Sequence, residues 1–500
     1  MILVRPTGGS KSLVYQVATY INKGITLFIS PLLALAFDQR QKLKKKTRDI
    51  PLTGSLHLDE MKPSTIKVIA DDISHIKDPE TGLCSGSMIL FASPQLLTGE
   101  RGKSILDAIL NKDSSSALHM VVMDEVHIAS QFGNTFRREF RLLKPRLYTK
   151  LPNCCKIRLF MTGTCTKTIL TQVEELAGFR ILNRHWPTKE EMRHRSVSIR
   201  LIYTPLILNV IKRSLGILLK QGSADKPKKA IIYSNMRIKI IGIGKKLGGF
   251  LNTDGHLYKI DYMVIHGQLS QEEKAGYLKL FMETSPKRDM RVLLATSGVA
   301  NAGIDSSKIH TAIRIEFPPS IQDICQEKGR VGRVPNASPL IYSYQICFDI
   351  DSFILLVKRT LNPDEKMDQT FRDQMMKDHL DVVKLFCTID GCFNDSFERA
   401  LSNPFITNVE SVDDSTNRCN NCPGCDGTIR DMFNKISICG AKNILFVAFT
   451  KQTSYNINDL VDCILNQQNI DRRLFHRRRR DDNMCHCCAP FGIKRPFCLA

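Results

Sequence analysis

The sequence has no long stretch of hydrophobic residues. No apolar run reaches the roughly 18 residues that a membrane-spanning helix requires. Residues 206–219 come closest, and Lys212 and Arg213 interrupt them. Residues 1–12 also lack a basic start followed by an apolar stretch and a small-residue cleavage site. We therefore expect no membrane association and no secretory signal. In the reducing compartment that this implies, the 17 cysteines would bind metal more readily than form disulfides.

Acidic residues are scarce relative to basic ones. The 500 residues include 71 Lys and Arg but only 50 Asp and Glu, which gives a net charge of +21 and a pI of about 9.3. This excess favours a polyanionic partner, which means nucleic acid or an anionic membrane surface. The hydrophobic content of 43% and the charged content of 24% exclude a mostly disordered chain. At roughly 150 residues per domain, the length predicts about three domains.

Short apolar runs recur through the first two-thirds of the chain. Runs of four to eight apolar residues without polar alternation are typical of strands that are buried on both faces. Longer segments between them, such as 11–22 and 271–283, can form crossover helices. The pattern occurs twice, with a break near residues 187–205, and it predicts two α/β lobes with parallel sheets. The predicted strands are 1–4, 26–29, 88–92, 120–123, 158–161, 230–233, 262–265, 291–295, 311–315 and 340–344.

A candidate phosphate loop follows the first predicted strand. Residues 6–12 read Pro-Thr-Gly-Gly-Ser-Lys-Ser and open a predicted helix. Backbone N–H groups at a helix start can hold phosphates, Lys11 can reach the β- and γ-phosphates, and the Ser12 hydroxyl can bind Mg²⁺. The nucleotide-binding residues expected here are Thr7, Gly8, Gly9, Ser10, Lys11 and Ser12. The alternative interpretation is a Gly-Ser turn with a surface lysine.

An acidic pair follows a later buried strand. The run 121–123 leads directly into Asp124, Glu125, Val126 and His127. The carboxyl ends of parallel strands form the edge at which α/β proteins bind ligands. Asp124 is expected to hold Mg²⁺, and Glu125 to position and deprotonate an attacking water. The alternative interpretation is a solvated helix cap.

A segment of the second lobe carries two arginines. Residues 326–333 read Gln-Glu-Lys-Gly-Arg-Val-Gly-Arg, so Arg330 and Arg333 are three positions apart. Both can face a γ-phosphate, as arginine fingers do. A basic surface helix is the alternative, although glycines inside a helix are costly.

These segments, in this order, resemble a superfamily 2 helicase of the RecQ family. Residues 6–12 resemble motif I, residues 30–35 with Asp38 and Gln39 resemble motif Ia, and residues 124–127 are a D-E-V-H form of motif II. Residues 162–164 resemble motif III. The second-lobe motifs are represented by residues 233–234, 266–267, Thr296 with 303–305, and 326–333. The resemblance covers about residues 1–427, and it adds His127 to the catalytic residues and Gly303, Asp305 and Gln326 to the nucleotide-binding residues.

The segment 130–137 resembles the aromatic-rich loop that couples DNA contact to ATP hydrolysis in RecQ proteins. The family's usual Trp is Phe132 here, and Phe136 and Arg137 follow it. We expect Phe132 and Phe136 to stack on single-stranded bases. The alternative is that both are core residues of the first lobe.

Three cysteines lie close together near residue 420. Cys419, Cys422 and Cys425 form two overlapping C-x-x-C steps, which gives three of the four thiolates that tetrahedral Zn²⁺ requires. Cys392, at the start of the helix-like run 393–401, is the favoured fourth ligand, and Cys387 is the alternative. The same ligands can hold an iron–sulfur cluster, but RecQ-like proteins place a zinc-binding subdomain here.

The resemblance implies the following organisation. Residues 1–190 form the ATP-binding lobe, 191–350 the second helicase lobe, and 351–427 a helical zinc-binding subdomain. Residues 428–500 form a basic, cysteine-containing tail, and a reduced or diverged form of the winged helix that the family places here is one interpretation of it. Its run 476–480 is a phosphate-contacting patch, a nuclear targeting signal or a solvated charge run.

The implied function is that of an ATP-dependent 3′→5′ DNA helicase in DNA repair and recombination. ATP, Mg²⁺ and Zn²⁺ are the expected cofactors, single-stranded DNA and duplex junctions the partners, and the nucleus the compartment. Two departures support a non-catalytic or degenerate DNA-binding protein as the alternative. Ser10 replaces the family's Gly, and the printed sequence lacks the family's adenine-reading Gln and stacking aromatic before motif I.

Overall fold

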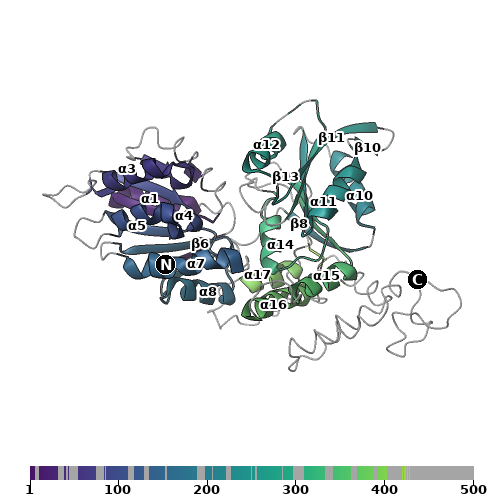
Figure 1. Cartoon of the computed structure of the whole chain (residues 1–500). Helices are drawn as coiled ribbons and strands as arrows, with labels where there is room; N and C mark the ends of the chain where they lie inside the picture. Colours follow the sequence, from purple (N-terminus) through teal and green to yellow (C-terminus); the bar gives the residue numbers. More distant parts are fainter. Residues whose placement is uncertain are drawn as a thin grey trace, which may run out of the picture. The chain divides into compact units, whose positions relative to one another are not determined.

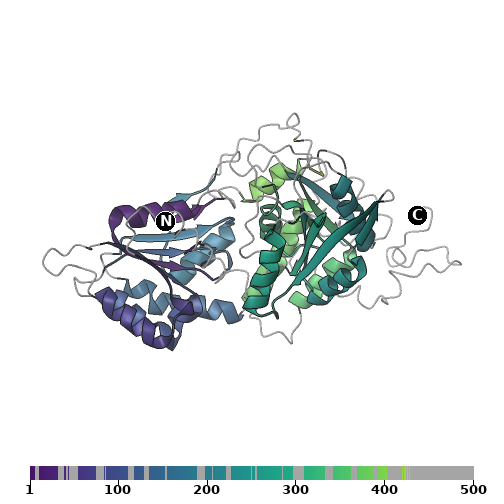
Figure 2. The same cartoon turned by 90° about the horizontal axis from the view of Figure 1, so that it is seen from above.

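The computed structural model describes much of the chain up to residue 429. The described residues are 1–5, 11–31, 36, 39–40, 43, 54–74, 84, 86–110, 117–128, 134–151, 155–187, 197–204, 206–220, 227–248, 250–253, 256–283, 285, 287–296, 309–332, 342–361, 369–386, 392–401, 419, 422–423, 425, 427 and 429. The chain divides into two compact units, residues 1–193 with 401–409 and residues 194–400 with 410–500 (Figures 1 and 2). Within the described residues, no helix is both long and apolar enough to cross a membrane.

The first unit is built on a seven-stranded parallel sheet with the strand order β3-β4-β2-β5-β6-β1-β7. Its strands are β1 (Ile2–Val4), β2 (Gly24–Ile29), β3 (Gly54–His57), β4 (Ser87–Ala92), β5 (Leu118–Met123), β6 (Ile157–Thr162) and β7 (Arg184–His185). Its helices are α1 (Lys11–Asn22), α3 (Pro63–Ser74), α4 (Pro94–Thr98), α5 (Lys103–Ile109), α7 (Asn134–Arg146) and α8 (Lys167–Ala177), with short 3-10 helices at Leu58–Glu60, Glu100–Gly102 and Tyr148–Lys150. The helix predicted over 11–22 is confirmed as α1.

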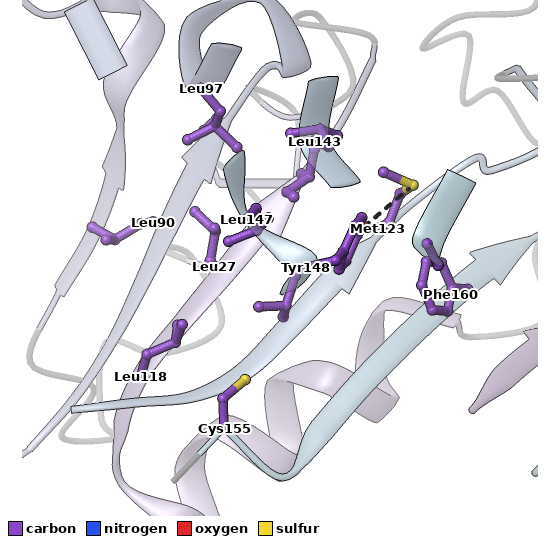
Figure 3. Close-up of a cluster of buried hydrophobic side chains, with 14 of the residues drawn as sticks. Leu27, Leu90, Leu97, Leu118, Met123, Leu143, Leu147, Tyr148, Cys155 and Phe160 are labelled. Atoms are coloured by element: carbon purple, nitrogen blue, oxygen red, sulfur yellow. Dashed lines mark hydrogen bonds between the residues drawn. The ribbon is translucent and has the colours of Figure 1, made fainter. Parts of the chain in front are cut away.

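Alternate residues of each central strand pack on opposite faces of this sheet. On one face, Phe28 lies between Tyr15 of α1 and Phe91 of β4, with ring centroids 4.7 and 5.0 Å apart. On the other face, Leu27 and Phe160 belong to a larger apolar cluster with residues of α3, α4, α5, α7 and α8 (Figure 3). Figure 3 also shows the Tyr148 hydroxyl donating to the Met123 sulfur, at 3.8 Å. Because both faces are covered, these strands are continuously apolar.

The second unit has a seven-stranded sheet with the order β10-β11-β12-β9-β13-β14-β8, in which only the β10–β11 pair is antiparallel. Its strands are β8 (Val197–Tyr203), β9 (Lys228–Ser234), β10 (Phe250–Thr253), β11 (His256–Ile265), β12 (Met290–Thr296), β13 (Ile309–Arg314) and β14 (Tyr342–Phe348). Its helices are α10 (Ile207–Lys220), α11 (Arg237–Leu247), α12 (Gln271–Met282), α14 (Ile321–Lys328), α15 (Ile350–Thr360), α16 (Gln369–Phe386) and α17 (Phe393–Leu401). The predicted α/β class with two parallel-sheet lobes is confirmed.

A chain of aromatic rings joins the last helices to the second sheet. Phe317 and Phe348 lie 5.6 Å apart between ring centroids, and each is 5.3 Å from Phe386 of α16. Phe386 in turn lies 6.2 Å from Phe393 at the start of α17. Figure 1 shows α15, α16 and α17 together beside α14. The segment that carries the cysteines is therefore packed against the second unit.

Candidate functional site

The start of α1 presents a lysine at the carboxyl edge of the first sheet. Lys11 is the first residue of α1, and its Nζ donates to the carbonyl of Arg5, which follows β1, at 3.1 Å. Ser12 is the second residue of the helix and is half-buried. Thr7, Gly8, Gly9 and Ser10 lie outside the described residues.

Asp124 follows β5 at the same edge of the sheet. Its side chain is buried, and its backbone N–H donates to the carbonyl of Ile29 at the end of β2, at 3.0 Å. Burial, followed by the charge of Glu125, raises the pKa of Asp124 to about 7, whereas the charge of Lys11 acts in the opposite direction. Lys11 and Asp124, more than 110 positions apart in sequence, are therefore close enough to interact electrostatically.

Glu125 has an unusual backbone conformation. Its φ is +47°, in the left-handed region that residues other than glycine rarely adopt. Its Oε2 lies 3.2 Å from Nδ1 of the buried His127. Strained backbone of this kind is concentrated at functional sites. The turn holds the Glu125 carboxylate beside a histidine while its neighbour Asp124 stays buried.

His127 joins this turn to the end of β6. Its Nδ1 lies 2.8 Å from Thr162 Oγ1, and the Thr162 hydroxyl donates to the carbonyl of Thr164 at 2.7 Å. Because the Thr162 proton is used in that bond, Thr162 and Glu125 both act as acceptors toward His127. We infer that Nδ1 carries the proton. The segments 124–127 and 162–164 thus form one hydrogen-bonded unit.

The second unit contains the described part of the arginine segment. Gln326 lies in α14, and Arg330 lies in the turn that follows this helix and is largely buried. The backbone N–H of Arg330 donates to the carbonyl of Glu327 at 3.2 Å. Arg333, Gly303 and Asp305 lie outside the described residues.

A buried ion pair beneath this turn was missed at the sequence level. Arg314, at the end of β13, is fully buried and donates to Glu327 Oε1 of α14 at 2.5 Å, and the Tyr344 hydroxyl donates to Glu327 Oε2 at 2.8 Å. Arg314 also donates to the side-chain oxygen of Asn235. Burial raises the pKa of Glu327 to about 7, although the charge of Arg314 opposes this. An arginine inside the otherwise apolar run 311–315 was the available signal.

Four cysteines converge beside α17. The Sγ atoms of Cys392, Cys419, Cys422 and Cys425 all lie within 4.8 Å of one another. The Sγ–Sγ distances are 3.5 Å for Cys392–Cys419, 3.7 Å for Cys392–Cys422 and 3.8 Å for Cys419–Cys425. A tetrahedral Zn²⁺ with Zn–S bonds of about 2.3 Å holds its sulfur ligands about 3.8 Å apart. The four side chains therefore fit a tetrahedral metal, whereas Cys387 lies outside the described residues.

The start of α17 directs donors at these sulfurs. The backbone N–H of Asp395 bonds to the sulfur of Cys392, and the backbone N–H groups of Asn394 and Cys425 bond to Cys422. The side-chain amide of Asn394 donates to Cys419 Sγ at 3.4 Å. Hydrogen bonds with the thiols of Cys419 and Cys422, together with burial, raise the pKa of Cys392. N–H donors and a helix N-terminus favour thiolates, the form that binds metal.

The residues predicted to contact DNA lie largely outside the described part of the chain. Phe132 lies outside the described residues, and Phe136 and Arg137 are described only as backbone of α7. The basic run 476–480 and the remainder of the tail beyond residue 429 also lie outside the described part of the chain.

The sequence of this chain is similar to those of known helicases. Residues 1–172 match the DEAD/DEAH box helicases, and residues 210–335 match the helicase conserved C-terminal domain. The chain is 25% identical over 367 residues to a putative ATP-dependent DNA helicase Q1 of Caenorhabditis briggsae, covering 71% of this chain and 52% of that protein. It is 24% identical over 347 residues to the ATP-dependent DNA helicase RecQ of Pasteurella multocida, covering 68% and 47%.

Among solved structures, S. cerevisiae Dbp5 bound to RNA and ADP BeF3 matches with a TM-score of 0.47 and 13% identity, over 76% of this chain and 82% of that one. The chain spans about half the length of the helicase Q1 and RecQ relatives named above.

Proposed function

This chain belongs to the helicases that join a DEAD/DEAH box domain to a helicase conserved C-terminal domain, and from that premise we propose that it is an ATP-dependent DNA helicase of the RecQ type. The single observation that carries the proposal is the grouping of Lys11, Asp124 and Glu125 at one edge of the first sheet. These three side chains supply a phosphate-binding cation, a metal-binding carboxylate and a general base.

Each of these residues has a separate part in ATP hydrolysis. Lys11 binds the β- and γ-phosphates, with residues 7–10 supplying backbone N–H groups around them. Ser12 and Asp124 would hold Mg²⁺, and its charge would favour the ionised form of the buried Asp124 carboxyl. Glu125 accepts a proton from the attacking water, and its carboxylate is oriented by the protonated Nδ1 of His127.

Further residues in the second lobe are assigned to the nucleotide by resemblance to the family. Arg330 and Arg333 stabilise the charge that develops on the γ-phosphate, and Gln326, Gly303 and Asp305 contact the nucleotide. His127 and Thr162 link the acidic turn to the residues 162–164, which supports their part in transmitting the state of the nucleotide to bound DNA.

The DNA-binding parts of the proposal rest on charge and on the relatives. The net charge of +21 supports binding to a phosphate backbone and makes that binding sensitive to salt. Phe132, Phe136 and Arg137 contact single-stranded DNA near the acidic turn. Movement is 3′→5′, the substrates are single strands and duplex junctions, and the biological role is DNA repair and recombination in the nucleus.

The four cysteines Cys392, Cys419, Cys422 and Cys425 bind Zn²⁺ in this proposal. When bound, the metal supplies cross-links that hold short segments together without a large apolar core. Accordingly, residues 351–427 form a helical zinc-binding subdomain after lobes at 1–190 and 191–350, and 428–500 form a basic tail.

The proposal is tested by measuring ATP hydrolysis with and without single-stranded DNA. The unmutated chain should hydrolyse ATP faster when DNA is present. Glu125→Gln should keep nucleotide binding but lose turnover, because the base is removed while the phosphate and Mg²⁺ ligands remain. Lys11→Ala should weaken nucleotide binding as well. Unwinding of duplexes with a 3′ or a 5′ single-stranded tail then tests direction.

Absence of DNA-stimulated hydrolysis in the unmutated chain would instead support a degenerate DNA-binding protein. The motif I departure from the family at Ser10 offers a direct check on that outcome. Recovery of hydrolysis in Ser10→Gly would locate the defect in the phosphate loop, since a side chain at a position that needs positive φ costs on the order of 1 kcal/mol.

A further inference from the structure

Lys328, the last residue of α14, is buried. Its side chain is 3% exposed, and its Nζ lies 5.2 Å from the centroid of the Phe397 ring in α17. Lysine is almost never fully buried unless a charge or a ring stabilises its ammonium group. Phe397 follows Cys392 by little more than one helical turn, so this lysine points toward the segment that carries the cysteine site.

The charges around Lys328 include those of the cysteine site itself. Burial lowers the pKa of Lys328, while the charges of Cys325, Glu398, Cys419 and Cys422 act in the opposite direction. Two of these four groups are proposed metal ligands, and their Sγ atoms lie among the four that meet within 4.8 Å.

A metal bound at this site leaves negative charge to be balanced. Four thiolates around one Zn²⁺ carry a formal charge of about −2. The N–H groups of Asn394 and Asp395 at the start of α17 offset part of it, but they are neutral dipoles. Burying uncompensated charge is costly, and a buried cation nearby is the direct means of lowering that cost.

Backbone hydrogen bonds connect Lys328 to the turn that contains Arg330. The backbone N–H of Val331 donates to the carbonyl of Lys328 at 3.1 Å, and that of Gly329 donates to Cys325 at 2.9 Å. Arg330 lies inside this hydrogen-bonded turn. A shift in the position of Lys328 therefore acts directly on the backbone that positions Arg330.

We propose that Lys328 is the buried countercharge of the four-cysteine metal site and that it ties metal occupancy to the turn that carries Arg330. The inference rests on the metal site of the proposed function. It makes Lys328 a positioning residue for the arginine, since nothing requires it to touch the nucleotide.

The first test measures how fast the full chain transfers zinc to a colorimetric chelator at fixed pH. Lys328→Met keeps the length of the side chain but removes its charge, and it should speed zinc release by roughly 10–100-fold, as loss of a residue that supports metal ligands does. Lys377→Met, in the exposed part of α16, is the matched control and should release zinc at the wild-type rate. Equal rates for Lys328→Met and the wild type would overturn the countercharge.

A second variant tests whether the positive charge of Lys328 balances the metal site or the carboxylate of Glu398. If Lys328 served only to neutralise Glu398, then Glu398→Gln added to Lys328→Met would restore slow release. We expect the double variant to release zinc as fast as Lys328→Met alone. A purified wild-type chain that holds no zinc would refute the metal site itself, which is a different result from equal release rates.

The link to Arg330 is tested on the unmutated chain, so it does not depend on a variant that folds. Hydrogen exchange at the amides of residues 329–332 should accelerate when zinc is removed. Amides of β1 to β6 in the first unit, measured in the same sample, are the control and should be unchanged. Unchanged exchange at 329–332 would show that metal occupancy does not reach the turn.

Discussion

At the scale of single residues, the buried ion pair between Arg314 and Glu327 contributes to the stability of the second unit. Both side chains are fully buried, and Glu327 also accepts from the Tyr344 hydroxyl. We expect Arg314→Met to lower the free energy of unfolding of this unit by about 3–5 kcal/mol, because it leaves a buried carboxylate without its partner. Urea unfolding, followed by hydrogen exchange of the β13 and β14 amides, measures this.

A double variant supplies the control for this pair. Arg314→Met with Glu327→Gln should be more stable than Arg314→Met alone, because the glutamine keeps an acceptor for Tyr344 but carries no charge. If the two substitutions were simply additive, the cost would come from lost packing of the arginine and not from an unpaired charge.

His379 of α16 provides a pH-dependent contribution to stability. Its Nε2 lies 2.9 Å from Thr360 Oγ1 and its Nδ1 lies 2.7 Å from the carbonyl of Pro319, and burial lowers its pKa to about 4. The unfolded chain, with a pKa near 6.5, binds the proton first. Stability from this group is therefore full above about pH 6.5 and falls on acidification toward pH 4, by on the order of 1 kcal/mol at pH 5.5.

The neighbouring Asp378 contributes a pH dependence of stability that is opposite to that of His379, so it serves as the comparison. Burial raises the pKa of Asp378 to about 7, so its folded form loses stability as the pH rises from about 4 to 7. Across pH 5–7, His379→Gln should flatten the loss of stability on acidification, and Asp378→Asn should steepen it. The same pH dependence in both variants would contradict the assignment.

At the scale of secondary-structure elements, buried cations at strand starts hold helix ends. Lys228 Nζ donates to the Leu218 carbonyl in the last turn of α10, and Lys229 Nζ donates to the Met282 carbonyl at the end of α12. Arg291 of β12 donates to the Glu283 carbonyl just beyond α12. The last carbonyls of a helix have no partner within the helix, so these cations satisfy groups that would otherwise be buried unpaired.

Removal of one of these cations should therefore loosen a helix end. Lys229→Met should lower the free energy of unfolding by about 1–3 kcal/mol, because the Met282 carbonyl loses its donor. Lys279→Met, on the exposed side of α12, should change it by no more than about 0.5 kcal/mol. Thermal unfolding of the two variants, compared with the wild type, distinguishes the loss of the bond to the Met282 carbonyl from the loss of a positive charge alone.

Most of the strands that were predicted from the sequence are buried on both faces, although 262–265 of β11 alternates between buried and partly exposed residues. The run 230–233 lies in the centre of the second sheet, where every residue of β9 is buried. By contrast, β8 was missed within the supposed break at 187–205. It lies at the edge of its sheet with Arg200 exposed, and its polar alternation conceals it from a search for continuous apolar runs.

In the candidate site, too, some residues were predicted from the sequence and others were found only in the structure. The group of Cys419, Cys422 and Cys425 is evident from spacing, and Cys392 was favoured because a helix begins after it; the structure brings all four together. Arg314 stood inside an apolar run, which was a sign of burial, but the sequence does not show that its partner is Glu327. Lys328 was not singled out, because nothing in the sequence distinguishes it from a lysine that faces solvent, and only the packing of α14 against α17 shows that it is buried.

At the scale of the whole molecule, metal removal should affect the two units unequally. All four cysteines of the cluster lie in the second unit, so we expect metal removal to destabilise that unit and not the first. Purified protein should contain about one zinc per chain, and Cys422→Ser should lose it, because three thiolates do not complete a tetrahedral site. Elemental analysis of both proteins checks this.

Cys84→Ser, in the first unit, is the control for this substitution. Cys84 lies near Gly24 and far in sequence from the four clustered cysteines. This variant should keep its zinc, and full zinc retention by Cys422→Ser would remove that residue from the site. An iron signal in place of zinc would keep the four ligands but change the metal.

The place of β1 in the first sheet has a consequence for biosynthesis. β1 pairs with β6 through Ile2 and Phe160 and with β7 through Ile2 and Arg184, so both of its partners are synthesised long after it. At about 5–20 residues per second, a ribosome needs roughly 8–32 s to pass from Ile2 to Phe160, the earlier of the two partners. During that interval β1 has no neighbour in its sheet, so the sheet of the first unit cannot form completely until nearly all of that unit has been synthesised.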